Sequence, residues 1–412
     1  MLGVRDAAET RRADRLNAGL DELGAAALLV LASSSRDPDL AGFVGAVHLG
    51  SSFLLWPKSQ PPLLGYLVDM ERGEAAATGL DLLAPGAKEL AELREQGASE
   101  AALCSAAVAQ ALENRGVAEG RLALAGHPPA GRTQTVVEAL AERGFEFEDG
   151  QQLVRRLRKT KPEKEIDGIR AAAEGTCAAF RQVAAVLASA EPKGNRLVRG
   201  GVTLTAGALR RTIAAQLAQH DLEQPEGNIV ACGSDAGVPH TQGSDDRELR
   251  PAESIVVDLY PRRRLFADCT RTFCIGRAGP RLAEAHTLCL QALEAATAAA
   301  EPGVSGHDLH GAACDRFEAA GFPTARSNPG TRTGYVHGLG HGVGYELHEL
   351  PSFRTRAGAD GELEVGDVIT LEPGLYDPDA GWGLRLEDLL VVSESGAENL
   401  TPLPYDLDPR SW

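Results

Sequence analysis

Several acidic residues of this sequence lie in segments that otherwise have the composition of buried strands. Asp258 lies near the end of residues 254–259 (SIVVDL), and Asp268 follows ten residues later in the predicted strand 266–275. A buried carboxylate is strongly unfavourable unless it has a partner or a metal ion. Residues 261–264 (PRRR) predict a turn between the two segments, so an antiparallel hairpin would bring both carboxylates together.

The same arrangement recurs near the end of the sequence. Glu372 ends the predicted strand 368–372, and Glu387 lies in the predicted strand 384–392, on the other side of a turn-rich loop. Four carboxylates on two hairpins repel one another strongly unless a multivalent cation neutralises them. Oxygen-rich ligation with one imidazole suits hard or borderline divalent ions, so the pattern predicts a site for Mn²⁺, Co²⁺ or Zn²⁺.

Three of the ten histidines occur within twelve residues between these hairpins. His337, His341 and His348 lie in the segment VHGLGHGVGYELHE. Its alternating glycines allow close backbone approach, but no Lys-Ser/Thr follows and there is no HExxH, so neither a phosphate-binding loop nor a zincin is predicted. A fourth histidine, His240, precedes Asp258 in a turn-rich segment. Alone it is typical of a structural residue, whereas the cluster of three favours a functional site.

The first 155 or so residues alternate predicted strands with predicted helices, which indicates an α/β domain with a central sheet. The predicted strands are 25–31, 52–56 and 122–125, and the predicted helices are 99–115 and 133–143. No His, Asp or Glu residues gather here at ligand spacing. The basic segment 153–165 (LVRRLRKTKPEKE) is interpreted as a domain boundary with a solvated charged face. Further helices are predicted at 166–190, 281–300 and 307–320.

Composition excludes several classes of protein. The net charge of −17 opposes phosphate backbones and anionic membranes, so no nucleic-acid or membrane partner is expected. No apolar stretch approaches the ~20 residues that span a bilayer, and the charged first fifteen residues do not resemble a signal peptide. Seven scattered cysteines without CxxC pairing fit a reducing cytoplasm.

The order of the motifs resembles the pita-bread metallopeptidases, family M24. The chain has Asp, Asp-x-Thr-Arg, His-Gly-x-Gly-His, His-Glu, Glu-Pro-Gly and Arg-x-Glu-Asp in sequence, over about residues 160–405. The family includes Xaa-Pro aminopeptidases (aminopeptidase P), Xaa-Pro dipeptidases (prolidases) and methionine aminopeptidases. The resemblance to its proline-specific branch implies an α/β domain like the creatinase/prolidase amino-terminal domain in residues 1–157. An α+β pita-bread catalytic domain would follow in residues 158–412.

The resemblance also implies a metal centre with two divalent ions per chain, of which manganese is expected and cobalt or zinc are alternatives. Their ligands would be Asp258, Asp268, His341, Glu372 and Glu387. In the family, the residues that match Asp268 and Glu387 bridge both ions, and the residue that matches Glu372 also takes a proton from the attacking water. The interval between Asp258 and Asp268 is one residue shorter than usual, which predicts a tighter turn.

Further roles follow from the same resemblance. His240 and His348 would assist the scissile amide and its tetrahedral intermediate, and His337 would line the substrate pocket. Arg385 would orient the last ligand, and Tyr376 matches a tyrosine of the pocket. These residues would complete a catalytic and substrate-binding set around the metals.

The implied function is hydrolysis of the bond between an N-terminal residue and a following proline by a metal-bridging hydroxide. The peptide would have proline at its second position, and the enzyme would be a homodimer. Aminopeptidase and dipeptidase activities stay open. Arg354 and Arg356 are candidates for binding a proline carboxylate, or ordinary surface charges. The alternatives are a methionine aminopeptidase-like or creatinase-like hydrolase, or a non-catalytic binding protein. Retention of all five ligands disfavours the metal-free creatinase type and the binding protein.

Overall fold

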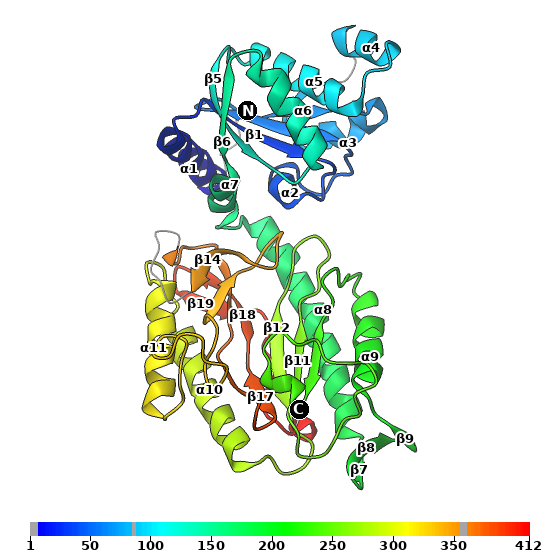
Figure 1. The fold of residues 1–412 in the computed structure, drawn as a ribbon, viewed down its shortest axis with the longest axis vertical. Coiled ribbons are helices and arrows are strands. Elements are labelled where there is room, and N and C mark those ends of the chain that lie inside the picture. Colours follow the sequence, from blue (N-terminus) through cyan, green and yellow to red (C-terminus); the bar gives the residue numbers. More distant parts are fainter. Residues whose placement is uncertain (1–6, 85–87, 354–360) are drawn as a thin grey trace. The chain divides into compact units, whose positions relative to one another are not determined.

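The computed structural model describes residues 7–84, 88–353 and 361–412. The chain divides into two compact units, Met1–Arg158 and Lys159–Trp412, which Figure 1 shows in blue to cyan-green and in green to red. Separate groups of buried apolar residues form the cores of these units. Each unit is therefore described by itself.

The first unit is built on a six-stranded mixed sheet in the order β4-β3-β2-β1-β5-β6. Its strands are β1 (Ala27–Ala32), β2 (Ser52–Pro57), β3 (Leu63–Tyr66), β4 (Asp81–Leu83), β5 (Gly120–Ala125) and β6 (Phe145–Asp149). Its helices are α1 (Ala7–Leu23), α2 (Pro38–Val44), α3 (Arg72–Ala77), α4 (Lys88–Glu95), α5 (Glu100–Asn114), α6 (Ala130–Ala141) and α7 (Gln151–Arg158). Strand β1 runs parallel to β5 and antiparallel to β2. The predicted α/β class is confirmed.

Strand β1 (ALLVLA) is apolar throughout because helices cover both faces of the sheet. Leu28 and Val30 pack in one core with residues of α1, α2 and α7, whereas Leu29 and Leu31 pack in another with residues of α5 and α6. Helix α5 begins as predicted, since the Ser99 side chain accepts a hydrogen bond from the Ala102 amide.

The second unit contains four α-helices and four small sheets among the residues that the structure describes. The sheet orders are β7-β8-β9, β10-β11-β12, β14-β13-β15-β18-β19 and β16-β17. The helices are α8 (Glu163–Ala188), α9 (Ala206–Ala218), α10 (Pro280–Ala299) and α11 (Gly306–Ala319). The first strands are β7 (Glu191–Lys193), β8 (Arg196–Arg199), β9 (Val202–Thr203), β10 (Ile229–Cys232), β11 (Ile255–Leu259), β12 (Cys269–Phe273) and β13 (Gly340–Gly342). The others are β14 (Glu349–Phe353), β15 (Val368–Leu371), β16 (Gly374–Asp377), β17 (Trp382–Arg385), β18 (Asp388–Ser393) and β19 (Gly396–Asn399).

The helices of the second unit flank its strands on two sides (Figure 1). Helices α10 and α11 pack on β15 and β18, through a core that includes Leu293, Phe317 and Ile369. Helices α8 and α9 pack against each other near β10. Within the described ranges, no helix is both long enough and apolar enough to cross a membrane.

Two predicted strands of this unit need correction. The segment 384–392 is not one strand, because β17 ends at Arg385 and β18 begins at Asp388. Between them the Glu387 amide donates to the Thr270 carbonyl at 3.0 Å, so the chain leaves β17 to bridge to β12. The segment 266–275 is also shorter than predicted, since β12 begins only at Cys269. Both interruptions fall at predicted metal ligands.

The basic segment 153–165 spans the end of the first unit and the start of the second, and it is only partly a solvated face, which corrects the interpretation from sequence. Arg158, Lys159 and Lys161 are all buried. The Lys159 ammonium lies 2.7 Å from Glu364 Oε1, and the Lys161 ammonium lies 2.9 Å from Glu349 Oε2. Acidic partners about 200 residues away accommodate the two lysines, whereas Arg158 lies 3.3 Å from Asp39. The local sequence does not reveal these partners.

Candidate metal centre and active site

The predicted hairpin between Asp258 and Asp268 is confirmed. Strands β11 and β12 pair antiparallel with Leu259 opposite Cys269, which places Asp258 inside β11 and Asp268 directly before β12. Both side chains are buried, with 7% and 4% of their residue surface exposed. The sequence pattern therefore correctly predicted the hairpin that carries these two acids.

The second pair of acids flanks the hairpin β16–β17. Glu372 directly follows β15, and Glu387 lies between β17 and β18. The Thr270 hydroxyl donates a hydrogen bond to Glu387 Oε2 at 2.7 Å, so the second hairpin is fixed to the first by both backbone and side chain. Strand β13 (Gly340–Gly342) pairs with β15 and presents His341.

These segments bring ligand atoms of Asp268, His341 and Glu387 within 4.8 Å of one another. His341 Nε2 lies 3.6 Å from Asp268 Oδ2 and 3.6 Å from Glu372 Oε1. Asp258 lies at the side of this group, where its Oδ2 accepts a hydrogen bond from Arg385 Nη2 at 2.5 Å. Ligand atoms of Asp268, His341 and Glu387 thus lie close together. Glu372 lies beside the His341 imidazole, and Asp258 is hydrogen-bonded to Arg385.

Burial and mutual repulsion dominate the electrostatics of the group. Burial raises the pKa of Asp268 well above its usual range, and the charges of Glu387 and Asp258 raise it further. Burial, followed by the charge of Glu372, raises the pKa of Glu387 in the same way. Burial also raises the pKa of Glu372 to about 7 and lowers the pKa of His341 to about 3. An uncharged imidazole therefore stands among carboxylates that need positive charge.

The donor set fits divalent metal ions. Asp258 Oδ1 is buried and has no hydrogen-bond partner, while its other oxygen is held by Arg385. A buried carboxylate oxygen without a hydrogen bond needs an explanation, and a bound cation supplies one here because Asp268, Glu372 and Glu387 of the same group all have raised pKa values. The other donors are carboxylates and one neutral imidazole, which suit Mn²⁺, Co²⁺ or Zn²⁺.

Several predicted residues form one hydrogen-bonded chain beside the metal group. Arg385 Nη1 donates to Tyr376 Oη at 3.0 Å, and Tyr376 Oη lies 2.9 Å from His337 Nε2. His337 Nδ1 in turn lies 2.8 Å from the Gly338 carbonyl. All of these hydrogen bonds can form when the Tyr376 hydroxyl donates to a neutral His337. A neutral ring is favoured because burial lowers the pKa of His337 to about 3. These hydrogen bonds hold the His337 ring with Nδ1 3.9 Å from Glu372 Oε2.

The remaining predicted residues differ in how closely they approach the group. The His348 ring packs on the His341 ring with centroids 4.2 Å apart, and the His348 residue is exposed. His240 is also exposed, and its charge contributes to the lowered pKa of His337. Arg354 and Arg356 lie outside the described residues.

Comparison with known proteins decides the family. The sequence profile of metallopeptidase family M24 matches residues 167–394, which is more than half of the chain. The chain belongs to metallopeptidase family M24. The probable dipeptidase PepE of Mycobacterium tuberculosis is 32% identical over 261 residues, 62% of each protein. The Xaa-Pro dipeptidase of Pyrococcus furiosus is 32% identical over 210 residues, which is 50% of this chain and 57% of that protein.

Solved structures agree on the M24 fold. The prolidase from Pyrococcus horikoshii superposes with a TM-score of 0.71 at 21% identity, over 96% of this chain and 99% of that one. The dipeptidase PepE from Mycobacterium ulcerans gives 0.70 at 25% identity, over 98% and 99%. The predicted fold, an α/β domain followed by a pita-bread domain, is confirmed. In sequence, the chain spans about 62% of the length of the first curated relatives that it matches.

The M24 centre contains supporting residues to which sequence reasoning gave no role. Thr270 donates to Glu387 and accepts from Arg385 Nε at 3.1 Å. Arg271 is buried, with Nη1 2.6 Å from the Glu387 carbonyl and Nη2 2.7 Å from Asp388 Oδ1. The available signal was the motifs themselves, since these residues stand beside ligands in Asp-x-Thr-Arg and Arg-x-Glu-Asp.

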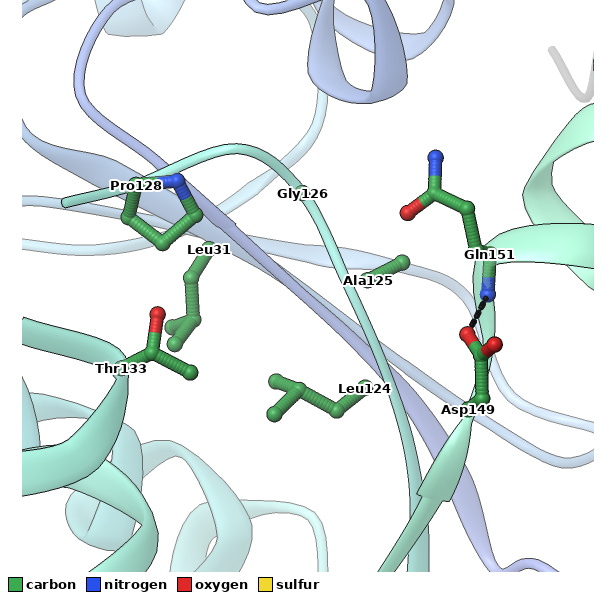
Figure 2. A pocket seen from close by; sticks show the side chains of 8 residues that line it. All are labelled: Leu31, Leu124, Ala125, Gly126, Pro128, Thr133, Asp149 and Gln151. Atoms are coloured by element: carbon green, nitrogen blue, oxygen red, sulfur yellow. Dashed lines mark hydrogen bonds between the residues drawn. The ribbon is translucent and has the colours of Figure 1, made fainter. Parts of the chain in front are cut away.

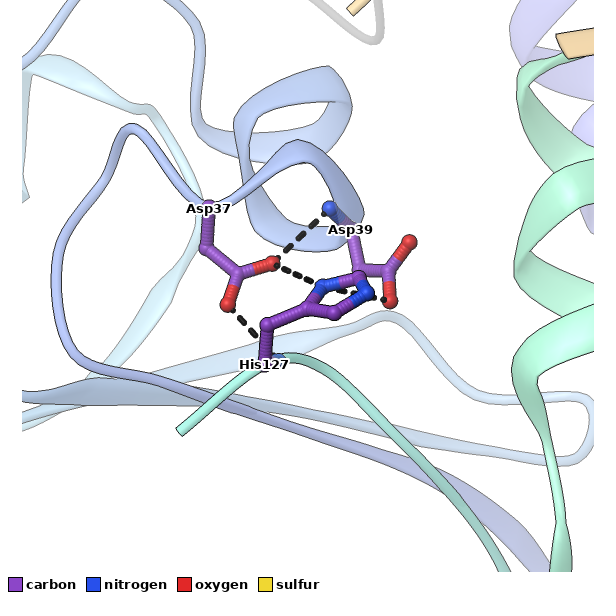
Figure 3. Close-up of side chains that lie close together, drawn as sticks. All are labelled: Asp37, Asp39 and His127. Atoms are coloured by element: carbon purple, nitrogen blue, oxygen red, sulfur yellow. Dashed lines mark hydrogen bonds and ion pairs between the residues drawn. The ribbon is translucent and has the colours of Figure 1, made fainter. Parts of the chain in front are cut away.

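The first unit also gathers three potential ligands, which the sequence did not reveal. Asp37, Asp39 and His127 have ligand atoms within 4.8 Å of one another, as Figure 3 shows. Asp37 Oδ1 caps helix α2 through the Asp39 amide, and its Oδ2 accepts from the His127 amide at 2.8 Å. Asp39 Oδ2 accepts from the Gln151 side chain at 2.6 Å. Asp39 Oδ1 has no hydrogen bond but lies 3.3 Å from Arg158 Nη1. Hydrogen bonds and this ion pair compensate the group, and we assign it no metal.

A small cavity of about 220 Å³ lies at the ends of β1 and β5 in the same unit (Figure 2). Leu31, Leu124 and Pro128 form part of its lining. Its polar lining includes Asp149, which accepts a hydrogen bond from the Gln151 amide at 2.8 Å. Because Gln151 is also bound to Asp39, the cavity has polar groups that are already engaged, and we assign it no role.

Proposed function

We propose that this M24 protein is a two-metal exopeptidase that hydrolyses the bond between an N-terminal residue and a following proline. The observation that carries the proposal is the convergence of Asp268, His341 and Glu387, with Glu372 3.6 Å from the same imidazole. Relatives named Xaa-Pro dipeptidase support the proline specificity.

The ligands in this proposal are the five that the motifs supply: Asp258, Asp268, His341, Glu372 and Glu387. Divalent ions held there would act as Lewis acids and lower the pKa of bound water. We propose Mn²⁺ as the physiological ion because oxygen donors dominate the set, with Co²⁺ and Zn²⁺ as the other candidates. Arg385 would hold Asp258 in place through its 2.5 Å hydrogen bond.

The protein's own residues would then handle the proton and the developing charge. Glu372 would accept a proton from the attacking water and return it to the proline nitrogen that leaves. His348 and His240 are exposed and able to donate hydrogen bonds to the scissile carbonyl oxygen as negative charge develops. His337, held by Tyr376, would border the substrate pocket next to Glu372.

The length preference of the enzyme is proposed to be that of a dipeptidase. Relatives named probable dipeptidase PepE and Xaa-Pro dipeptidase support this choice. Arg354 and Arg356 are the proposed cations for the carboxylate of a dipeptide. The alternative is an aminopeptidase, since an X-Pro aminopeptidase from Thermotoga maritima shares the fold with a TM-score of 0.66.

We also propose a cytoplasmic homodimer in which residues 1–157 and 158–412 are the two domains. All seven cysteines are buried and free, which suits a reducing compartment. Size-exclusion chromatography with light scattering tests the dimer, since a molar mass near 43.3 kDa would contradict it.

The deciding experiment is hydrolysis of a peptide panel by protein depleted of metal and then loaded with Mn²⁺. We expect metal-dependent cleavage of Xaa-Pro, with turnover falling as Xaa-Pro-Yaa peptides lengthen, and no cleavage of the same peptides with alanine in place of proline. Equal turnover of longer peptides would identify an aminopeptidase. Preferred cleavage after an N-terminal methionine, or hydrolysis of creatine by the chelated protein, would contradict the proposal.

A further inference from the structure

The second unit contains a fully buried ion pair near the metal centre that the mechanism above does not use. Lys161 Nζ lies 2.9 Å from Glu349 Oε2, and their side chains are 0% and 1% exposed. A buried ion pair is not in general a strong stabilising device, because removing two charges from water offsets most of their attraction. Its presence at this depth therefore calls for a reason other than stability.

The pair connects three segments that are distant in sequence. The Lys161 amide donates to the Gly366 carbonyl, and its ammonium also donates to the Lys159 carbonyl at 3.0 Å. Glu349 uses its other oxygen, Oε1, to accept from the Glu346 amide at 3.1 Å. The carboxylate of Glu349 thus fixes the turn that precedes it to the start of the unit.

That turn, residues 343–348, carries or contacts several groups of the candidate centre. It begins after His341 and ends with His348, whose ring packs 4.2 Å from the ring of His341. The Gly344 carbonyl accepts from the Phe266 amide at 2.8 Å, two residues before Asp268. The turn is therefore the common neighbour of two predicted ligands and one predicted catalytic histidine.

Gly344 shows how closely the turn is fitted to the ion pair. A Cβ atom at this position would lie 2.4 Å from Glu349 Oε2 and 2.9 Å from Lys161 Cε. Contacts this short are not tolerated by real Cβ atoms. The absence of a side chain at Gly344 is thus what allows the pair to lie directly against the turn.

We propose that Lys161 and Glu349 are positioning residues, which fix the turn 343–348 and thereby hold His348 over His341 for the peptidase reaction. The inference rests on the proposed function and deepens it, since it assigns a role to a pair outside the ligand set. Outer partners of metal-site residues commonly change activity by about 10–100-fold when they are replaced.

The test is a double-mutant cycle with Glu349→Gln and His348→Ala in the Mn²⁺-loaded full-length protein. We expect Glu349→Gln to lower kcat about 10–100-fold with little change in KM. In the His348→Ala background the same substitution should have no further effect on kcat, because the residue that it positions is gone. The matched control is Glu364→Gln, which breaks the Lys159 pair two residues away and should leave kcat unchanged.

Two further measurements keep the test decisive if single variants are unstable or the peptides are not cleaved. The double variant Lys161→Met/Glu349→Leu removes both buried charges, so it should fold, yet its kcat should stay as low as that of Glu349→Gln. Hydrogen exchange of the metal-free protein should be faster in residues 343–348 of Glu349→Gln than in Glu364→Gln. This readout does not depend on hydrolysis, so it separates failure of the inference from failure of the proposed function.

Three results would overturn the inference. The first is an unchanged kcat in Glu349→Gln. The second is an equal fold-loss with and without His348, which would mean that the pair acts by another route. The third is recovery of full kcat in the apolar double variant, which would mean that packing alone positions the turn.

Discussion

The two groups of potential metal ligands in the described part of the chain differ in how their charges are compensated. In the first unit, Asp37 and Asp39 accept hydrogen bonds from the backbone and from Gln151, and Arg158 lies 3.3 Å from Asp39. Their histidine, His127, is half exposed. In the second unit the acids repel one another in a buried space, and His341 is only 12% exposed.

Proximity of ligand atoms does not by itself define a metal site. Both groups have ligand atoms within 4.8 Å. The buried oxygens Asp39 Oδ1 and Asp258 Oδ1 both lack a hydrogen bond, but Asp39 Oδ1 lies 3.3 Å from Arg158 Nη1. In the second group, burial and the neighbouring acids raise the pKa of both Asp268 and Glu387. Uncompensated negative charge is what distinguishes the group that we propose to hold metals.

The largest expected effect is a difference between the two histidines. His341→Ala should abolish hydrolysis and lower the bound metal, because it removes the imidazole ligand that contacts two acids. His127→Ala, the matched change in the first unit, should keep both the metal content and the turnover of the native protein. Metal analysis after dialysis and hydrolysis of Xaa-Pro measure the two effects. Loss of an ion in His127→Ala would break the comparison.

The next effect concerns the acid that we propose as the proton carrier. Glu372→Gln should lower kcat about 10²–10⁴-fold at saturating Mn²⁺, which is the usual contribution of general acid–base catalysis. The exposed surface acid Glu398, which pairs with Arg170, provides the control as Glu398→Gln. Native kcat in Glu372→Gln would rule out the proposed role.

A pH-dependent difference should follow from the charge of Glu372 in the metal-free protein. Burial raises the pKa of this carboxyl from 4.5 to about 7, so the folded state binds the proton more tightly than the unfolded state. Stability from this group is present below pH 4.5 and is lost as the pH rises through about 7. Glu372→Gln should therefore melt a few degrees higher than the native protein at pH 8, but not at pH 4.

Thermal unfolding followed by circular dichroism checks this difference, and added Mn²⁺ provides the contrast. The ion should stabilise the native protein more than Glu372→Gln, since it binds the carboxylate. The expected direction would be contradicted if, without metal, the melting temperature of the native protein rose relative to that of Glu372→Gln between pH 4 and pH 8.

The smallest effect is expected in the first unit. Asp37→Ala removes the cap of helix α2 and should lower the free energy of unfolding by about 1 kcal/mol. It should leave hydrolysis unchanged, because the group serves structure. Denaturant unfolding measures the loss of stability. A loss of turnover in Asp37→Ala would show that the group of Asp37, Asp39 and His127 is not purely structural.

The fold class and the centre of the candidate site could be predicted from sequence because their signals are local. Acids at the ends of apolar runs predicted the hairpin that joins Asp258 and Asp268, and the glycine-flanked histidines predicted the segment that presents His341. Strand ends were less accurate. Leu386 and Glu387 look like strand residues, yet the chain leaves β17 there to pair with Thr270.

Residue type and order were enough to predict which side chains carry the proposed chemistry, since ligand motifs are read without reference to distant partners. Which charges are compensated depends on the folded structure. It buried Lys161 against Glu349, which follows 188 residues later, and it joined Asp37 and His127 by a hydrogen bond. Pairing across such separations depends on packing of the whole unit, and no local pattern of residues encodes it.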